Sequence, residues 1–233
     1  MTLLTTAQNI LKETKSATIP TTIIGNVEDT AVQVLQALTV SITNLARTYE
    51  WQQLQKEHTF ATVASTQTYS LPVDFDRLIN NTFWNSTTMM KVIGAISPQE
   101  WRVLTNSTAN NSTIADYYRL RANLITLFPT PSGVENFVLE YISSYIVKSS
   151  GGSGQTGWEA DTDVPVLDEY LLRLDATWRL LKMQGRPYGE EQKDADLAIA
   201  ERLAVNGSKK TIVHFDNSSF RTNRIGYPTT VVG

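Results

Sequence analysis

Two aspartates separated by a single residue are the first candidates for chemistry. Asp74 and Asp76 flank Phe75, shortly after Pro72. Paired carboxylates can divide the work of a general acid and a general base. Aspartate is also favoured in turns, where its side chain hydrogen-bonds to the nearby backbone. We therefore expect a turn here, with acid/base chemistry as the alternative.

A second acidic group precedes a predicted helix. Asp161, Asp163 and Asp168 lie within eight positions of one another, around Pro165, which we expect to begin the helix. Carboxylate oxygens are ligands that Ca²⁺ accepts. Carboxylates close to a helix N-terminus are also stabilised by the helix dipole, which is the simpler explanation. We expect no metal site and no cofactor.

Sequence motifs for catalysis are missing. The chain has no cysteine and two histidines, His58 and His214, and neither histidine has a nucleophile at a recognisable spacing. Nucleotide-binding loops, zinc-protease motifs and the serine-hydrolase elbow do not occur. The sequence thus favours a protein that is not an enzyme. A glycosidase needs only two suitable carboxylates, so a cell-wall hydrolase using Asp74 or Glu100 is retained as an alternative.

Composition sets wide bounds. The 233 residues are 41% hydrophobic and 18% charged, with a formal net charge of −3, enough for one sizeable domain or two small ones. The net charge gives no argument for nucleic-acid binding. No apolar run approaches the roughly 18 residues of a membrane span. The N-terminus lacks a basic start and an apolar stretch, so we expect neither a secretion signal nor membrane contact.

Apolar residues follow a helical period near both ends of the chain. A short helix runs to about Lys15, and a longer one follows a capping Asn26 and continues to Tyr49. Two more are expected, from Pro165 to about Leu181 and over 190–205. The apolar stripes of both late helices are expected to pack on the 27–49 helix.

Between the helices the apolar period changes to two. We expect several short strands, with a hairpin at Ala122-Asn123 and a strong strand over 137–148. Ser97, Pro98 and Glu100 indicate the start of a short helix. Polar or Gly/Ser-rich loops are expected at 106–113 and 149–157. The predicted fold class is α+β: a helical bundle (1–56 and 158–205), an inserted, mostly antiparallel β region (57–157) and an extended C-terminal arm (206–233).

The arm has no helical period, yet it carries large apolar side chains that an inert linker would lack. Its four basic residues minus Asp216 give a local charge of +3. Aromatic and basic residues together also occur in single-strand nucleic-acid binding, but the acidic body favours docking on a protein. The candidate partner-binding residues are Ile212, Phe215, Phe220, Arg221, Arg224, Ile225 and Tyr227.

Three phrases, in this order and spacing, resemble a known family. They are the Y-x-LP-x-DF segment in Tyr69–Leu78, the run Leu124–Pro131 followed by Leu139-Glu140-Tyr141, and the helix opening Asp163–Leu172. The pattern resembles the head-to-tail adaptor proteins (connector, or tail tubular A-like) of tailed, particularly short-tailed, bacteriophages.

The resemblance implies a structural, non-enzymatic subunit of the virion, made in the host cytoplasm. About twelve copies are then expected to form a ring between the portal protein and the tail nozzle or tail tube protein. The helical bundle would form the ring wall, and the β region would face the next tail component. The arm would reach the portal or a neighbouring subunit, and DNA would pass through the channel without sequence-specific binding.

A receptor-binding tail module is a further alternative, because the chain is rich in Asn, Thr and Trp. Such modules usually show repeats or mostly strands, whereas this chain has three apolar helical stripes.

Overall fold

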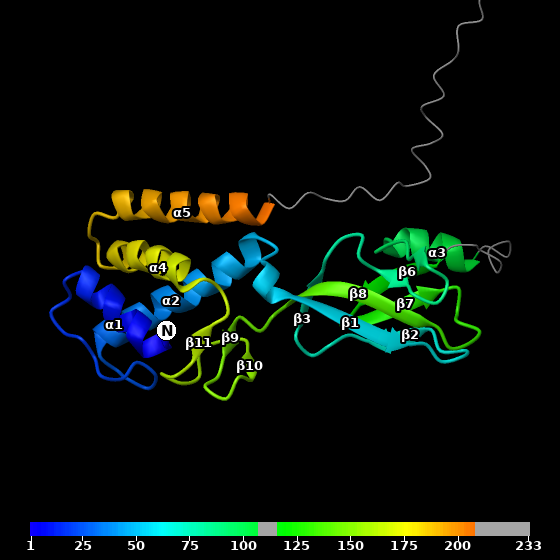
Figure 1. The fold of residues 1–233 in the computed structure, drawn as a ribbon, viewed down its shortest axis with the longest axis horizontal. Coiled ribbons are helices and arrows are strands. Elements are labelled where there is room, and N and C mark those ends of the chain that lie inside the picture. Colours follow the sequence, from blue (N-terminus) through cyan, green and yellow to red (C-terminus); the bar gives the residue numbers. More distant parts are fainter. Residues whose placement is uncertain (107–115, 208–233) are drawn as a thin grey trace, which may run out of the picture.

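The computed structural model describes residues 1–106 and 116–207. Its shape is elongated, with helices at one end and most of the strands at the other (Figure 1). Helices and antiparallel sheets together confirm the predicted α+β class. Residues 208–233 of the predicted arm (206–233) lie outside the described residues. So do residues 107–113 of the predicted polar loop (106–113).

Four helices make up one end of the molecule. They are α1 (Leu3–Glu13), α2 (Asp29–Thr48), α4 (Glu169–Met183) and α5 (Gly189–Gly207). α4 packs against both α2 and α5, and α1 contacts α2 and α4. Figure 1 shows α5 as the outer layer over α4. The prediction that both late helices pack on α2 is therefore right for α4, whereas the main contact of α5 is with α4.

Two helix starts differ from the sequence-based prediction. Asn26 does not cap α2, because its Oδ1 accepts a hydrogen bond from the Glu28 amide (2.9 Å) and the helix begins only at Asp29. Pro165 does not begin α4 but lies in the short strand β11 (Val164–Pro165). The cap is Asp168, whose Oδ1 accepts from the Tyr170 amide (2.9 Å). A proline is tolerated in an edge strand, and the Asp168 side chain supplies the acceptor that is favoured at a helix N-cap.

The largest sheet is built around β8 (Asn136–Ser143), which pairs on one side with β1 (Gln55–Ala61). On its other side lie β3 (Phe75–Leu78) and β4 (Trp84–Asn85), and β4 also pairs with β5 (Met90–Lys91). A second sheet has the order β2 (Thr68–Ser70), β7 (Leu124–Phe128), β6 (Tyr117–Arg121). A small third sheet has the order β10 (Gly154–Gln155), β9 (Val147–Lys148), β11.

Local turn and cap chemistry agrees with the sequence. The hairpin between β6 and β7 turns at Ala122 and Asn123, both with positive φ (50° and 61°), as a two-residue hairpin turn requires. The helix α3 (Pro98–Asn106) begins with the predicted capping box: Glu100 Oε2 accepts from the Ser97 amide (2.9 Å), and Ser97 Oγ accepts from the Glu100 amide (3.2 Å). Part of the predicted 149–157 loop forms β10.

The described residues contain two hydrophobic clusters. One fills the helical end, and the other lies between the sheets around Phe83, Phe137 and Ile125. Strand β8 reaches both: Ile142 belongs to the helical cluster and the preceding Tyr141 to the β cluster. Because successive residues of a strand point to opposite faces, the end of β8 joins the two parts. No helix among residues 1–106 and 116–207 has the length and apolar character needed to cross a membrane.

Candidate functional site at the junction of the two parts

The junction contains a buried carboxylate with three side-chain donors. Asp74 precedes β3 and is only 7% exposed. Its Oδ2 accepts from Lys56 Nζ of β1 and from Ser143 Oγ of β8, each at 2.6 Å, and its Oδ1 accepts from Tyr141 OH at 2.9 Å. The backbone carbonyl of Asp74 accepts from the Ser144 amide at 2.7 Å. One residue thus connects β1, β8 and the start of β3.

The electrostatics of Asp74 are those of a stabilised anion. Burial alone would raise the pKa of Asp74, but hydrogen bonds from Lys56, Ser143 and Tyr141, with the charge of Lys56, outweigh it and lower the pKa. Burial, followed by the bond to Asp74, raises the pKa of Tyr141 to about 12. A general base needs a pKa near the working pH. The lowered pKa of Asp74 lies far from neutral pH, so this carboxylate is poorly suited to act as a general base. Its hydrogen bonds instead hold the strands together.

Asp76, which the sequence pairs with Asp74, points elsewhere. Its Oδ2 lies 2.7 Å from Nη1 of the neighbouring Arg77, and its side chain is 46% exposed. The expected turn is present, since the Phe75 amide donates to the Pro72 carbonyl (3.1 Å). The two aspartates do not converge on a shared site.

His58 lies on β1 and stacks on Phe60, with ring centroids 5.7 Å apart. Burial lowers the pKa of His58, and the negative charge of Asp74 opposes this effect. Its buried Nε2 has no hydrogen-bond partner among the residues that the structure describes. His58 is therefore best described as a neutral ring packed against the aromatic side of the sheet.

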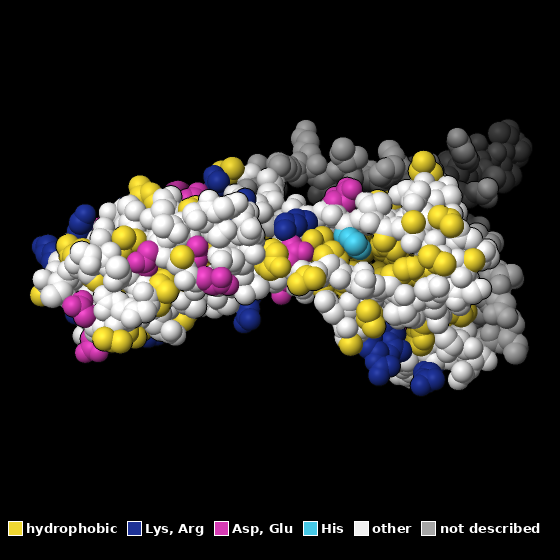
Figure 2. All heavy atoms as spheres, turned by 90° about the horizontal axis from the view of Figure 1, so that it is seen from below, with side chains coloured by type: hydrophobic (Ala, Val, Ile, Leu, Met, Phe, Trp, Pro, Cys, Tyr) yellow, Lys and Arg dark blue, Asp and Glu magenta, His cyan; other side chains and the backbone are white. Residues whose placement is uncertain are grey.

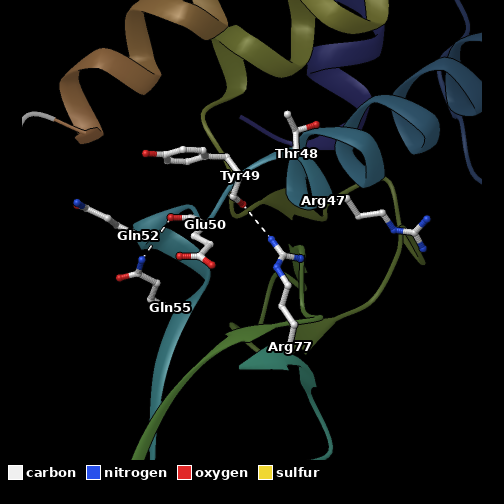
Figure 3. A pocket seen from close by; sticks show the side chains of 7 residues that line it. All are labelled: Arg47, Thr48, Tyr49, Glu50, Gln52, Gln55 and Arg77. Atoms are coloured by element: carbon white, nitrogen blue, oxygen red, sulfur yellow. Dashed lines mark hydrogen bonds between the residues drawn. The ribbon is translucent and has the colours of Figure 1, made fainter. Parts of the chain in front are cut away.

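A polar depression of about 480 Å³ lies beside the junction (Figure 3). Arg77 Nη2 reaches across it from β3 and donates to the Ala46 and Tyr49 carbonyls at the end of α2, both at 3.1 Å. Arg47 extends away from Arg77 in this view. The remaining lining residues are Thr48, Glu50, Gln52 and Gln55. Arg77 therefore acts as a side-chain cap that attaches the sheet to α2.

The second acidic group binds loop backbone and caps one helix. Asp161 accepts from the Ile23 amide with both oxygens (3.1 Å) and from the Ile24 amide (2.8 Å). The buried Asp163 accepts from the amides of residues 159 and 160, both at 2.8 Å. Asp168 caps α4, and its Oδ2 lies 3.6 Å from Nη2 of Arg202 in α5. Residues 1–106 and 116–207 contain no group of three or more acidic or histidine side chains arranged to hold a metal ion.

The predicted partner-binding residues (Ile212, Phe215, Phe220, Arg221, Arg224, Ile225 and Tyr227) all lie outside the described residues. Sequence reasoning missed Lys56, Tyr141 and Ser143, which surround Asp74, and the cap made by Arg77. The only signal was the Asp-Phe-Asp-Arg run at the start of β3. These pairs are separated by 18 to 69 residues in the sequence, and pairing at such separations leaves no trace in local spacing.

The carboxylates described above hold strands, loop backbone and a helix start in place, which is a structural role. The sequence model of the SU10 adaptor protein family matches residues 1–218, and the chain belongs to this family. The resemblance to phage adaptors is thereby confirmed: the chain is a structural adaptor of a bacteriophage, and so a virion component that associates with other phage proteins. No curated protein matches the sequence.

Proposed function

We propose that this adaptor forms a ring of about twelve copies between the portal and the tail nozzle or tail tube, and completes the DNA channel there. The observation that carries the proposal is the adaptor family match over residues 1–218. The elongated, two-part fold adds support, because each end offers its own surface for a different neighbour (Figure 1). The short-tailed assignment remains a prediction.

The β part is proposed to face the next tail component. Several apolar side chains of this part are largely exposed, among them Val73 (89%), Met89 (80%) and Val134 (73%). On the face shown in Figure 2, apolar side chains gather over the β part and are scattered over the helical part. Exposed apolar patches mark protein contacts more often than isolated residues do.

The helical part, with sequence limits 1–56 and 158–205, is proposed as the ring wall, and 57–157 as the β insertion. The net charge of −3 suits a channel that lets DNA pass without holding it. The arm is proposed to bind the portal or a neighbouring subunit through its apolar and basic side chains, with the entropy cost of ordering offset by apolar burial.

The arm proposal is tested with Phe215→Ser combined with Phe220→Ser. We expect the double variant to lose attachment to the portal ring of the same genome, measured by co-sedimentation, with an unchanged circular dichroism spectrum. Val27→Ser, at a residue 90% exposed on the body, is the matched control and should attach normally. Attachment of the double variant at the level of the control would refute the arm proposal.

The cell-wall hydrolase alternative loses support from its own candidate residues. Three side-chain donors engage Asp74, and Glu100 caps α3. Hydrogen bonds from the Ser97 backbone and side chain lower the pKa of Glu100, which is the wrong direction for a general acid. We expect no clearing in peptidoglycan zymography.

A further inference from the structure

We propose that the outer face of α5 in one copy docks into the groove between α2 and α4 of the next copy. The inference rests on the proposed ring and names the two surfaces that build it.

The groove has an apolar floor and a basic rim. It measures about 150 Å³, a volume that accommodates a benzene-sized apolar group. Arg179 lies 4.4 Å from the centre of a Trp178 ring, and Lys182 lies 5.8 Å from it. A solvent-accessible Trp beside apolar neighbours is a frequent anchor of protein interfaces. The lining residues are Gln36, Ala37, Val40, Trp178, Arg179, Lys182 and Met183.

The α2 side of the groove lacks charges. Residues 30–46 of this 20-residue helix contain no Asp, Glu, Lys or Arg, although Val32 is 50% exposed and Gln36 is exposed too. The solvent face of a surface helix normally carries charged side chains. Depletion of charge is the compositional mark of an interface core. The exposed face of α2 therefore has the character of a contact surface.

The outer face of α5 has the opposite character. Glu190, Asp194, Leu197 and Glu201 are spaced by four, three and four residues, so they share one face of the helix, and all four are exposed. Leu197 is 63% exposed in the middle of this stripe. The exposed Ala200 and Ala204 follow beside it, which permits close approach. Figure 1 shows α5 as the outer helix of its layer.

The two surfaces complement each other in apolar character and in charge. Leu197 supplies an apolar side chain for the groove, and the acidic residues on either side of it can meet Lys182. Arg179 already pairs with Asp175, with its Nε 2.8 Å from Asp175 Oδ2, so Lys182 is the rim cation on which the charge match rests. Such complementarity fixes the register and the choice of partner. Because the stripe and the groove lie on different surfaces of one chain, the contact is heterologous, and repeated contacts close into a ring when the rotation permits.

The absence of cysteine allows a direct test by cross-linking. Gln36→Cys and Leu197→Cys are introduced together, the portal ring of the same genome is added, and copper–phenanthroline oxidises neighbouring thiols to disulfides. We expect a ladder of covalent multimers on a non-reducing gel. Each single-cysteine variant can form at most a disulfide-linked dimer, and we expect it to stay monomeric on the gel. The pair Val27→Cys with Leu197→Cys should give no ladder.

The outcomes separate the interface from the function. Multimers by native mass without a ladder would overturn the interface and leave the proposed ring intact. A wild-type chain that never multimerises would overturn the proposed ring, and the interface with it. A disulfide-linked dimer from the Leu197→Cys variant alone would indicate an isologous contact and also overturn the inference.

A charge exchange provides a second readout that needs no chemical cross-link. Lys182→Glu alone, or Asp194→Lys with Glu201→Lys, places like charges across the interface. We expect each variant to need about tenfold more protein for assembly. Mixing the two variants restores complementary pairs in an alternating ring and should restore wild-type assembly. If the mixture assembles no better than its components, the proposed contact is wrong.

Discussion

At the scale of single residues, Asp74 determines how the β part is joined together. Three donors from two strands meet on one side chain with 10% of its surface exposed. A buried donor that loses its acceptor costs about 1–3 kcal/mol. The sequence showed that Asp74 sits in a turn, but its partners lie up to 69 residues away, and local spacing does not reveal such pairs.

We predict that Asp74→Ala lowers the free energy of unfolding by about 3 kcal/mol, because Tyr141 and Ser143 keep buried hydroxyls without an acceptor. Urea unfolding measures this change. Asp76→Ala is the matched control: its exposed pair with Arg77 contributes little, and a change below about 1 kcal/mol is expected. Equal effects of the two substitutions would contradict the role given to Asp74.

The same residue predicts a dependence on pH. The folded pKa of Asp74 lies below the ordinary 3.8, so its charge stabilises the fold fully above that value and progressively less as pH falls through the folded pKa. The difference in unfolding free energy between wild type and Asp74→Asn should be constant from about pH 7 to 5. It should become smaller below about pH 4. A difference that stays the same at low pH would show that folding does not lower the pKa of Asp74.

At the scale of elements, the sequence predicted helices and strands better than their ends. The capping box of α3 and the Ala122-Asn123 turn were predicted because their determinants lie within four residues. The start of α4 was wrong because Pro165 pairs as a strand with Val147, a contact that depends on tertiary structure. The absence of charge in residues 30–46 could be seen in the sequence, but only the apolar stripe of this helix was interpreted, as a packing surface.

The end of α2 provides an element-scale prediction. Arg77→Met removes two hydrogen bonds to the Ala46 and Tyr49 carbonyls, and we expect a loss of about 1–2 kcal/mol in unfolding free energy. Hydrogen exchange at the last turn of α2 should become faster, while exchange at α1 stays unchanged. Arg47→Met, in the same depression, is the control. Similar exchange in both variants would show that Arg77 does not cap the helix.

At the scale of the whole molecule, this structural adaptor has three distinct surfaces. In the proposed ring, the helical part offers the α5 stripe and the α2–α4 groove to its own copies. The β part exposes apolar side chains at the other end. The sequence predicted the adaptor family through three phrases spread over Tyr69–Leu172, and the family match confirmed it. The surfaces themselves needed the fold, because their residues come from helices far apart in the chain.

The central claim is the ring at the portal, and native mass tests it most directly. The chain is measured alone and after mixing with the portal ring of the same genome. We predict a monomer alone and a complex that gains about twelve copies when the portal is present. A stable monomer in both samples, with an unchanged portal mass, would contradict it.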